Sequence, residues 1–217
     1  MQVIVNSAMT VDGKIATRED DSAISSKDDL IRVHKLRDSV DGIIVGISTV
    51  LADNPRLTIR LGRKRPKEKH LTRIIIDSMG RIPIDSQILC TASKIKTIVA
   101  VTKLAHVKVI RKIEKTGATV IVAGTHTVDL KKVLRTVQRM GINKILVEGG
   151  GEINWSLFRL GIVNELIVTI APRIVGGRQA TTLVEGEGYP MISQGIKLQL
   201  KKVHMQNSGE LVLHYKV

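Results

Sequence analysis

Residues 42–60 have the sequence GIIVGISTVLADNPRLTIR, and this stretch decides the fold class. It begins with an uninterrupted apolar run, Gly42–Ile47, which is typical of a strand covered on both faces of a sheet. Ser48–Ala52 then predicts a short helix that ends near Asn54-Pro55, because the residue before a proline disfavours helical geometry. A buried strand that runs directly into a helix is the repeating unit of an α/β fold.

The same alternation of apolar runs and helical stretches extends in both directions along the chain. Further buried strands are predicted at Val3–Asn6, Thr72–Asp77, Lys96–Thr102, Thr119–Ala123 and Lys144–Val147. Helices are predicted at Ser25–Val40, Val107–Lys115, Asp129–Met140 and Glu152–Leu160. Strands separated by helices of this length imply right-handed crossovers and a largely parallel sheet.

Two of the predicted helices carry apolar residues at helical spacing. In the first helix, Ser25 or Ser26 caps the start, and the shared face consists of Leu30, Val33, Leu36 and Val40. In the helix that stops at Gly141, the shared face consists of Leu130, Val133, Leu134 and Val137.

The pattern changes after Gly161. Three strand-like segments follow with little helix between them, namely Glu165–Ile170, Ile196–Met205 and Glu210–Val217. Asn207-Ser208-Gly209 is a hairpin turn signal between the last two segments. We therefore predict one α/β domain over residues 1–217, with a mostly parallel central sheet, flanking helices and a C-terminal antiparallel ribbon.

The net charge is strongly positive, because 34 Lys and Arg against 20 Asp and Glu give +14. Such a charge is also typical of a basic nucleic-acid-binding protein, which is the alternative hypothesis from another functional class. The segment Arg60–Lys69 would then contact the nucleic acid. The single Trp, two Tyr and single Phe argue against single-strand binding, which usually needs aromatic rings for stacking. A solvated basic surface is the simpler explanation of that segment, and we expect no nucleic-acid partner.

Several other classes are excluded by composition. The lone Cys90 allows no internal disulfide and no cysteine-rich zinc site; it suits the reducing cytoplasm and is expected to be a small buried hydrophobic residue. No apolar run approaches 18 residues, so no membrane-spanning helix is predicted. The six His lack metal-ligand spacing, and His34 is expected to serve packing or surface rather than catalysis, so no metal site is expected.

Four segments after predicted strands could carry chemistry. They are the loop at residues 7–15 with its Asp12-Gly13 turn, Ser48 and Thr49, residues 77–81, and the three glycines in Val147–Asn154. Glycines let a backbone approach a ligand closely, and helix starts attract anions. Ordinary turns, and helix capping by Ser48 and Thr49, remain the alternatives from the residues alone.

Taken together, six segments resemble one family. They are MTVDGKIA (9–16), DSAISS (21–26) before a helix ending in KLRD (35–38), residues 42–60, IIIDSMGRI (74–82), LVEGGGEIN (146–154) and APRIVGG (171–177). In this order they resemble the riboflavin-biosynthesis pyrimidine reductases, both the stand-alone forms and the C-terminal half of the bifunctional deaminase-reductase. Many relatives carry a Trp where this chain has Ala23.

The resemblance implies a dihydrofolate-reductase-like fold, NADPH as the hydride donor and a homodimer. By position, it implies cofactor contacts at Ala8, Thr49, Asp53, Ser78, Gly150, Gly151, Glu152, Ile153 and Asn154. It implies substrate contacts at Arg37, Leu57, Arg60 and Glu148, with Asp21 or Ser22 as a looser match. Ser78 and Arg81 would suit the 2′-phosphate of NADPH.

The implied reaction converts the ribosylamino group of 2,5-diamino-6-ribosylamino-4(3H)-pyrimidinone 5′-phosphate into a ribitylamino chain. The N-glycoside would open to an imine, and hydride would reach its C1′ carbon. Asp12 and Glu148 are the predicted catalytic residues for proton transfer, and Lys14 competes with Asp12 for that role. A reductase of another pteridine or pyrimidine, such as dihydrofolate, is the alternative on the same fold.

Overall fold

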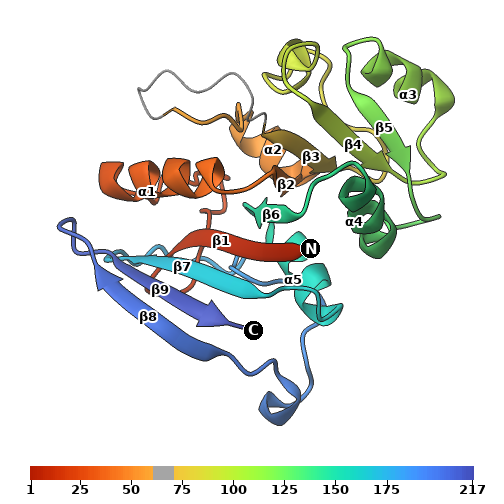
Figure 1. Ribbon diagram of the computed structural model, residues 1–217. Coiled ribbons are helices and arrows are strands. Elements are labelled where there is room, and N and C mark those ends of the chain that lie inside the picture. The colour runs from red at the N-terminus through yellow and green to blue at the C-terminus, as the bar shows by residue number, and fades with distance from the viewer. Residues whose placement is uncertain (61–70) are drawn as a thin grey trace. The chain divides into compact units, whose positions relative to one another are not determined.

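The computed structural model describes residues 1–60 and 71–217, which form two compact units. The first unit comprises Met1 and Leu36–Ile145, and the second comprises Gln2–Lys35 and Leu146–Val217. Figure 1 labels the helices and strands of both units. The single domain over residues 1–217 stays a prediction.

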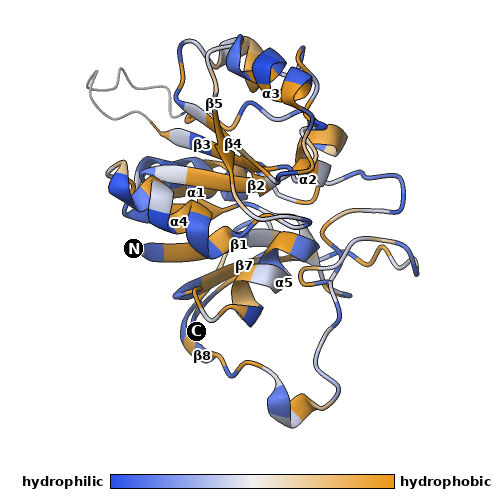
Figure 2. Cartoon of the chain, turned by 90° about the vertical axis from the view of Figure 1, so that its right-hand side faces the viewer, coloured by the Kyte–Doolittle hydropathy of each residue, from blue (hydrophilic) through white to orange (hydrophobic). Residues whose placement is uncertain are grey.

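The first unit is built on four parallel strands in the order β5-β4-β3-β2 (Figure 1). Their bounds are β2 (Gly42–Gly46), β3 (Thr72–Ile76), β4 (Thr97–Val101) and β5 (Thr119–Val122). Every residue of β2, β3 and β4 is buried, as the apolar runs predict for strands covered on both faces. Figure 2 shows β4 in the hydrophobic colour, whereas α3 alternates between the two colours.

In the described part of this unit, three helices and one short 3₁₀ turn follow these strands along the chain. They are α2 (Ile47–Asp53), α3 (Val107–Glu114), α4 (Leu130–Arg139) and the turn η1 (Leu89–Thr91). The predicted apolar face of α4 is confirmed, since all four of its residues are buried. Asp129 caps this helix by accepting a hydrogen bond from the Lys132 N–H at 2.9 Å, which satisfies a backbone donor that the first turn leaves without a partner.

The second unit contains the predicted antiparallel ribbon. Strand β1 (Gln2–Thr10) pairs in parallel with β7 (Glu165–Ala171), which pairs antiparallel with β9 (Leu211–Lys216). β9 then pairs antiparallel with β8 (Gln199–Met205) through a hairpin. Gly209, with a φ of +84°, closes that hairpin by donating its N–H to the Gln206 carbonyl at 3.0 Å.

Three further elements complete the chain. Strand β6 (Lys144–Val147) begins among the residues of the first unit and ends among those of the second. The helix α5 (Gly151–Arg159) follows it and buries Trp155 and Phe158. A 3₁₀ turn, η2 (Ile192–Gln194), precedes the ribbon. The predicted α/β class, with a mostly parallel sheet and a C-terminal antiparallel pair, is confirmed.

The helix α1 (Lys27–Asp38) forms where predicted, but its expected apolar face is partly wrong. Leu30 is 50 % exposed, and the helix instead buries Asp29 completely. Asp29 accepts hydrogen bonds from Ser25 Oγ at 2.7 Å, Arg32 Nε at 2.7 Å and Thr169 Oγ1 at 2.8 Å. Burial alone would raise the pKa of Asp29, but Arg32 above all, through its hydrogen bond and charge, holds the pKa below its ordinary value.

Two further expectations concern single segments. Cys90 is exposed rather than buried, because it lies in the η1 turn at the surface. Of the charged segment Arg60–Lys69, only Arg60 lies within the described residues. In the described part of the chain, no helix is long and apolar enough to cross a membrane, and no group of three metal-ligand side chains occurs.

Candidate functional site

The first unit presents its predicted cofactor residues at the carboxyl ends of β2 and β3. These ends lie at one edge of the sheet, because the two strands are parallel neighbours. β2 runs directly into α2, whose cap residue is Gly46 and which has no side-chain capping bond. Capping therefore does not explain the hydroxyls of Ser48 and Thr49. Thr49 is half-buried, and Asp53 is exposed at the last position of the helix.

The loop after β3 is organised by a buried carboxylate. Asp77 is fully buried, and its Oδ2 accepts the Ile82 N–H at 2.8 Å. Next to it, the Ser78 carbonyl accepts the backbone N–H of Thr102 at 3.0 Å and the Thr102 hydroxyl at 2.8 Å. These bonds fix the half-buried Ser78 at the same edge of the sheet.

Arg81 extends from this loop with a side chain that is 57 % exposed. Its Nε lies 4.0 Å from Asp77 Oδ1, which is within ion-pair range but too long for a hydrogen bond. Asp77 Oδ1 is buried and has no hydrogen-bond partner in the described part of the chain. The pair therefore orients Arg81 only loosely and leaves its guanidinium accessible to a ligand.

The predicted substrate residues of the first unit lie on a braced segment. Arg37 Nη1 donates to the Thr58 carbonyl at 2.9 Å, which ties the end of α1 to the chain beside Leu57. Leu57 is buried with a φ of +48°, a left-handed conformation that is unfavourable for a branched side chain. Such backbone strain persists only where the surroundings enforce it, and it occurs often at binding sites.

Two side chains hold this segment from the other side. The Gln87 N–H donates to Asn54 Oδ1 at 2.9 Å, and Gln87 Nε2 donates to the Asn54 carbonyl at 2.6 Å. The buried Arg73 donates from Nη1 to the Arg56 carbonyl at 3.3 Å. Sequence reasoning missed Gln87 and Arg73, because each acts on residues far away along the chain.

In the second unit, Asp12 lies just beyond the carboxyl end of β1. Its carboxylate accepts hydrogen bonds from Thr10 Oγ1 at 2.6 Å, from the Gly176 N–H at 2.7 Å and from the Val175 N–H at 3.2 Å. The Thr10 hydroxyl, followed by the Gly176 N–H, lowers the pKa of Asp12 from 3.8 to about 2. Asp12 is therefore ionised at neutral pH, and it holds the segment at residues 171–177 in place.

A segment that the sequence did not single out, residues 180–185, joins the loop after β1. Lys14 Nζ donates to the Ala180 carbonyl at 3.3 Å, and the Ile15 N–H donates to the Thr181 carbonyl at 2.9 Å. Lys14 also forms an isolated antiparallel bridge with Thr182. The only signal in the sequence was its position directly after the APRIVGG motif.

The same segment packs against the glycine-rich turn between β6 and α5. Gly149 and Gly150 have φ values of +115° and +87°, which favour glycine. A Cβ on Gly151 would lie 2.6 Å from the Thr182 carbonyl oxygen, so the chain passes too closely for any side chain. The turn therefore requires glycine for its backbone conformation and for close packing.

Asn154 is the most informative predicted residue of α5. It is fully buried, and its Nδ2 donates to the Leu183 carbonyl at 2.8 Å. Its Oδ1 is buried without a hydrogen-bond partner among residues 1–60 and 71–217. An unsatisfied buried acceptor is unfavourable and indicates a missing donor.

The other predicted residues of this unit lie nearby along the chain. Glu148 and Ile153 are half-buried, and Glu152 is exposed. Ala8 is half-buried on β1, opposite Thr169 of β7. The predicted site residues thus fall into two sets, one in each unit.

The topology and these turns define the class of the protein as an α/β fold of the dihydrofolate-reductase-like type. A dihydrofolate reductase from Enterococcus faecalis aligns over 99 % of this chain and 95 % of its own, with a TM-score of 0.50 and 15 % identity. RibD from Acinetobacter baumannii aligns over 99 % of this chain and 57 % of its own, with a TM-score of 0.84 and 22 % identity. The predicted fold is confirmed.

Residues 1–213 match the RibD C-terminal domain family, and the chain belongs to that family. A relative from Methanothermobacter thermautotrophicus is named 2,5-diamino-6-ribosylamino-4(3H)-pyrimidinone 5′-phosphate reductase. It is 43 % identical over 99 % of this chain and 97 % of its own length. The predicted family is confirmed, and the reductase-type fold indicates a nicotinamide cofactor.

Proposed function

We propose that this protein reduces 2,5-diamino-6-ribosylamino-4(3H)-pyrimidinone 5′-phosphate to its ribitylamino product, with NADPH as the reductant. The observation that carries the proposal is the 43 % identity, over nearly the full length of both chains, to a reductase named for that compound. The ordered turns at the strand ends support it, since ligands of open α/β sheets bind at such turns.

The residues present fit a dinucleotide cofactor, which supplies the hydride when it is bound. In the second unit we assign cofactor contacts to Ala8 and Gly150–Asn154, and the unsatisfied Asn154 Oδ1 supports this assignment because it needs a donor. In the first unit we assign Thr49, Asp53 and Ser78, whose hydroxyls and carboxylate can bind hydroxyl and amide groups.

We assign the preference for NADPH over NADH to Ser78 and Arg81, which can bind a 2′-phosphate. Replacing Arg81 with Gln should raise KM for NADPH strongly and leave KM for NADH unchanged. Arg111→Gln, on the exposed surface of α3, is the matched control. Equal changes in KM for both cofactors would remove Arg81 from this role.

For the substrate, we assign the phosphoribosyl group to Arg37, Leu57 and Arg60. The braced conformation of this segment supports the assignment, because a binding residue held in place loses less entropy when the ligand binds. Opening of the N-glycoside to an imine requires a proton transfer at the ring oxygen and nitrogen.

We assign that proton transfer to Glu148, which follows β6 directly, and place Asp12 in a different part of the mechanism. With a pKa lowered to about 2, Asp12 is a poor proton donor at neutral pH. We propose that it acts as a positioning residue that orders residues 171–177.

The activity test mixes the protein with NADPH and the diaminopyrimidinone substrate and follows the NADPH absorbance. The deaminated uracil analogue is run in parallel, and we expect it to react more slowly. Arg60→Gln should raise KM for the phosphorylated substrate, whereas Arg139→Gln, exposed at the end of α4, should not. Absence of NADPH oxidation with either substrate would refute the proposed function.

Glu148→Gln and Asp12→Asn separate the two roles. Glu148→Gln should lower kcat about a hundredfold, the usual contribution of a general acid or base, with KM little changed. Asp12→Asn should alter KM together with kcat, because it loosens a segment rather than removing the proton. If both variants stay near wild type, the assignment of acid–base chemistry to these carboxylates is wrong.

We also propose that the protein is a cytoplasmic homodimer. One face of the β8–β9 ribbon presents exposed apolar side chains, with Val203 51 % and Met205 70 % exposed beside Leu200 and Leu211. Such a patch on an edge strand is unfavourable in water and suits a second copy of the chain. Replacing Val203 and Met205 with Lys should give a monomer in sedimentation, whereas Lys201→Gln should not.

A further inference from the structure

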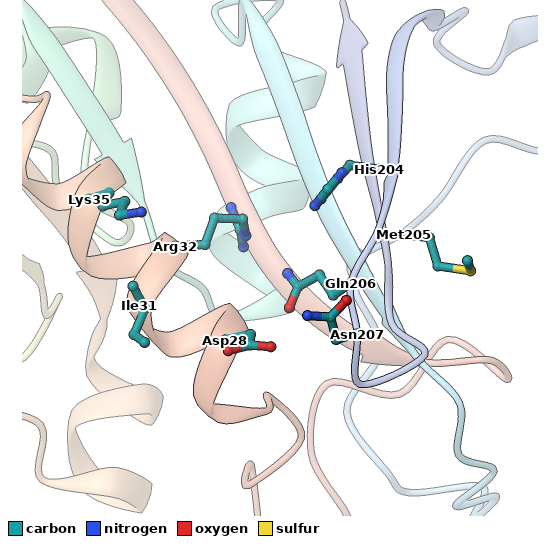
Figure 3. Close-up of a pocket in the computed structure, with 8 residues that line it drawn as sticks. All are labelled: Asp28, Ile31, Arg32, Lys35, His204, Met205, Gln206 and Asn207. Carbon is teal, nitrogen blue, oxygen red and sulfur yellow. The ribbon is translucent and has the colours of Figure 1, made fainter.

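A cavity lies between α1 and the β8–β9 hairpin, entirely within the second unit (Figure 3). Its volume is about 460 Å³, which is in the range of sites for small molecules. It is lined by Asp28, Ile31, Arg32, Lys35, His204, Met205, Gln206 and Asn207. None of these residues belongs to the site assigned above.

The polar side chains of this cavity converge from its two walls. Figure 3 shows Arg32 and Lys35 extending from α1 toward the ribbon, and His204 and Gln206 extending from the ribbon toward α1. Met205 points to the opposite side of the ribbon. The cavity therefore gathers nitrogen donors from two different elements at one place.

Arg32 is held in position by its neighbours. Its Nε donates to Asp29 Oδ1 at 2.7 Å, and its Nη2 donates to Thr169 Oγ1 at 3.1 Å. A guanidinium has five N–H groups in a rigid fork, so these two bonds fix its plane while others face the cavity. Preorganised guanidinium groups of this kind are well suited to bind phosphate.

Gln206 contributes an acceptor with no partner. Its side-chain Nε2 donates to Asp29 Oδ1 at 3.3 Å, and this contact fixes the orientation of the amide, because the reverse orientation would bring two oxygens together. The residue is only 8 % exposed, and its Oε1 is buried without a hydrogen-bond partner in the described part of the chain. A ligand in this cavity would need a hydroxyl or N–H group to satisfy it.

The electrostatic surroundings favour an anion. Burial, and then the positive charges of Arg32 and Lys202, lower the pKa of the neighbouring His214, whereas the negative charge of Glu165 acts in the opposite direction with a smaller effect. Of the two carboxylates in the first turn of α1, Asp29 is already bound to Arg32. Asp28 at the rim is then the one acidic lining residue against Arg32 and Lys35.

We propose that this cavity binds a small phosphate monoester that carries hydroxyl groups. The phosphate contacts Arg32 and Lys35, His204 supplies a further nitrogen, and a hydroxyl donates to Gln206 Oε1. The proposal does not rest on the proposed enzymatic function, since the two sites share no residue. The same chemistry occurs in free sugar phosphates and in the phosphoribosyl group of the proposed substrate.

The test is calorimetric titration of the protein with D-ribose 5-phosphate, with D-ribose and with inorganic phosphate. We expect D-ribose 5-phosphate to bind at least about tenfold more tightly than either fragment, since only it satisfies both parts of the cavity. Lys35→Gln and Gln206→Met should each weaken its binding about tenfold, equivalent to about 1.4 kcal/mol. Lys131→Gln, on the exposed side of α4, is the matched control.

Three outcomes would overturn the proposal. These are no binding of D-ribose 5-phosphate, binding that Lys35→Gln leaves unchanged, and binding of inorganic phosphate as tight as that of the sugar phosphate. Lys35 is exposed on α1, so Lys35→Gln is expected to fold. Its effect on binding therefore tests the proposal even if Gln206→Met fails to fold. Repeating the titration with Arg60→Gln separates this cavity from the substrate site, because that variant should lose substrate affinity but keep the Lys35-dependent binding.

Discussion

Replacing Arg73 with Met tests how the segment proposed to bind the substrate is held. Arg73 on β3 is fully buried, and it forms no ion pair within the described residues. Its guanidinium instead donates to neutral oxygens, with contacts of 3.0 Å or less to Thr97 Oγ1, Thr91 Oγ1 and the Ile88 carbonyl. Two longer bonds of 3.3 Å reach the carbonyls of Arg56 and Ile95.

The magnitude follows from two opposing contributions. Burial lowers the pKa of Arg73 to about 10, and the charged form is correspondingly destabilised by roughly 3 kcal/mol. The four short bonds from this charged donor reach three oxygens and contribute about 2 kcal/mol for each oxygen, or roughly 6 kcal/mol together. The difference, about 3 kcal/mol, is the expected loss of unfolding free energy in Arg73→Met.

Urea denaturation of Arg73→Met and wild type measures this loss as a lower midpoint with an unchanged slope. Arg111→Met, on the exposed side of α3, is the matched control and should change stability by less than about 0.5 kcal/mol. We also expect Arg73→Met to raise KM for the phosphorylated substrate, because Arg73 binds the carbonyl of Arg56 next to Leu57. Stability within about 0.5 kcal/mol of wild type would refute the view that these bonds outweigh the burial of the charge.

Three further predictions follow from the second unit. The pKa of Asp12 lies below its ordinary value, so its ionised form stabilises the fold above pH 3.8, and this stabilisation is lost as the pH falls toward about 2. In acid unfolding, wild type should therefore lose stability more steeply than Asp12→Asn between these pH values. Parallel acid-unfolding curves would contradict this. Gly151→Ala should destabilise the protein by about 1–3 kcal/mol in urea denaturation, because its Cβ would meet the Thr182 carbonyl at 2.6 Å, and wild-type stability would contradict that close packing. Asp29→Leu should lower the free energy of unfolding by about 3 kcal/mol, because it leaves the Arg32 charge without its partner. Asp29→Asn keeps an acceptor and should lower it by less. Equal losses in urea denaturation would contradict the ion pair.

The elements of the first unit were predictable because their causes are local. The apolar runs of β2, β3 and β4 are buried on both faces, and four apolar positions of α4 at helical spacing are all buried. In these segments the burial pattern follows directly from hydrophobic periodicity.

The apolar face predicted for α1 was partly wrong, and the reason is a distant interaction. Asp29 is buried because Thr169 and Gln206, about 140 and 177 positions later, supply its hydrogen bonds together with Ser25 and Arg32. A polar residue enters the interior when distant partners satisfy it, and periodicity within one helix contains no information about those partners.

The candidate site shows the same division between local and distant causes. The glycines at 149–151 were identifiable, since positive φ values and close approach both require glycine. The segment at residues 180–185 was not, because it contributes backbone carbonyls to Lys14, Ile15 and Asn154 that any sequence could offer. Contacts made by backbone atoms leave little trace in side-chain identity.

The net positive charge of the chain is not by itself a measure of its affinity for anions. The buried Arg73 donates its hydrogen bonds inside the first unit, and Arg37 donates one to the Thr58 carbonyl. Neither side chain is therefore fully available to an anion. The remaining positive charge raises the local concentration of anions, and the two ligands proposed above, NADPH and a sugar phosphate, are both anions. Long-range attraction then depends on the sum of the charges, whereas recognition depends on the few donors, such as Arg32, whose geometry is fixed by a neighbouring acceptor.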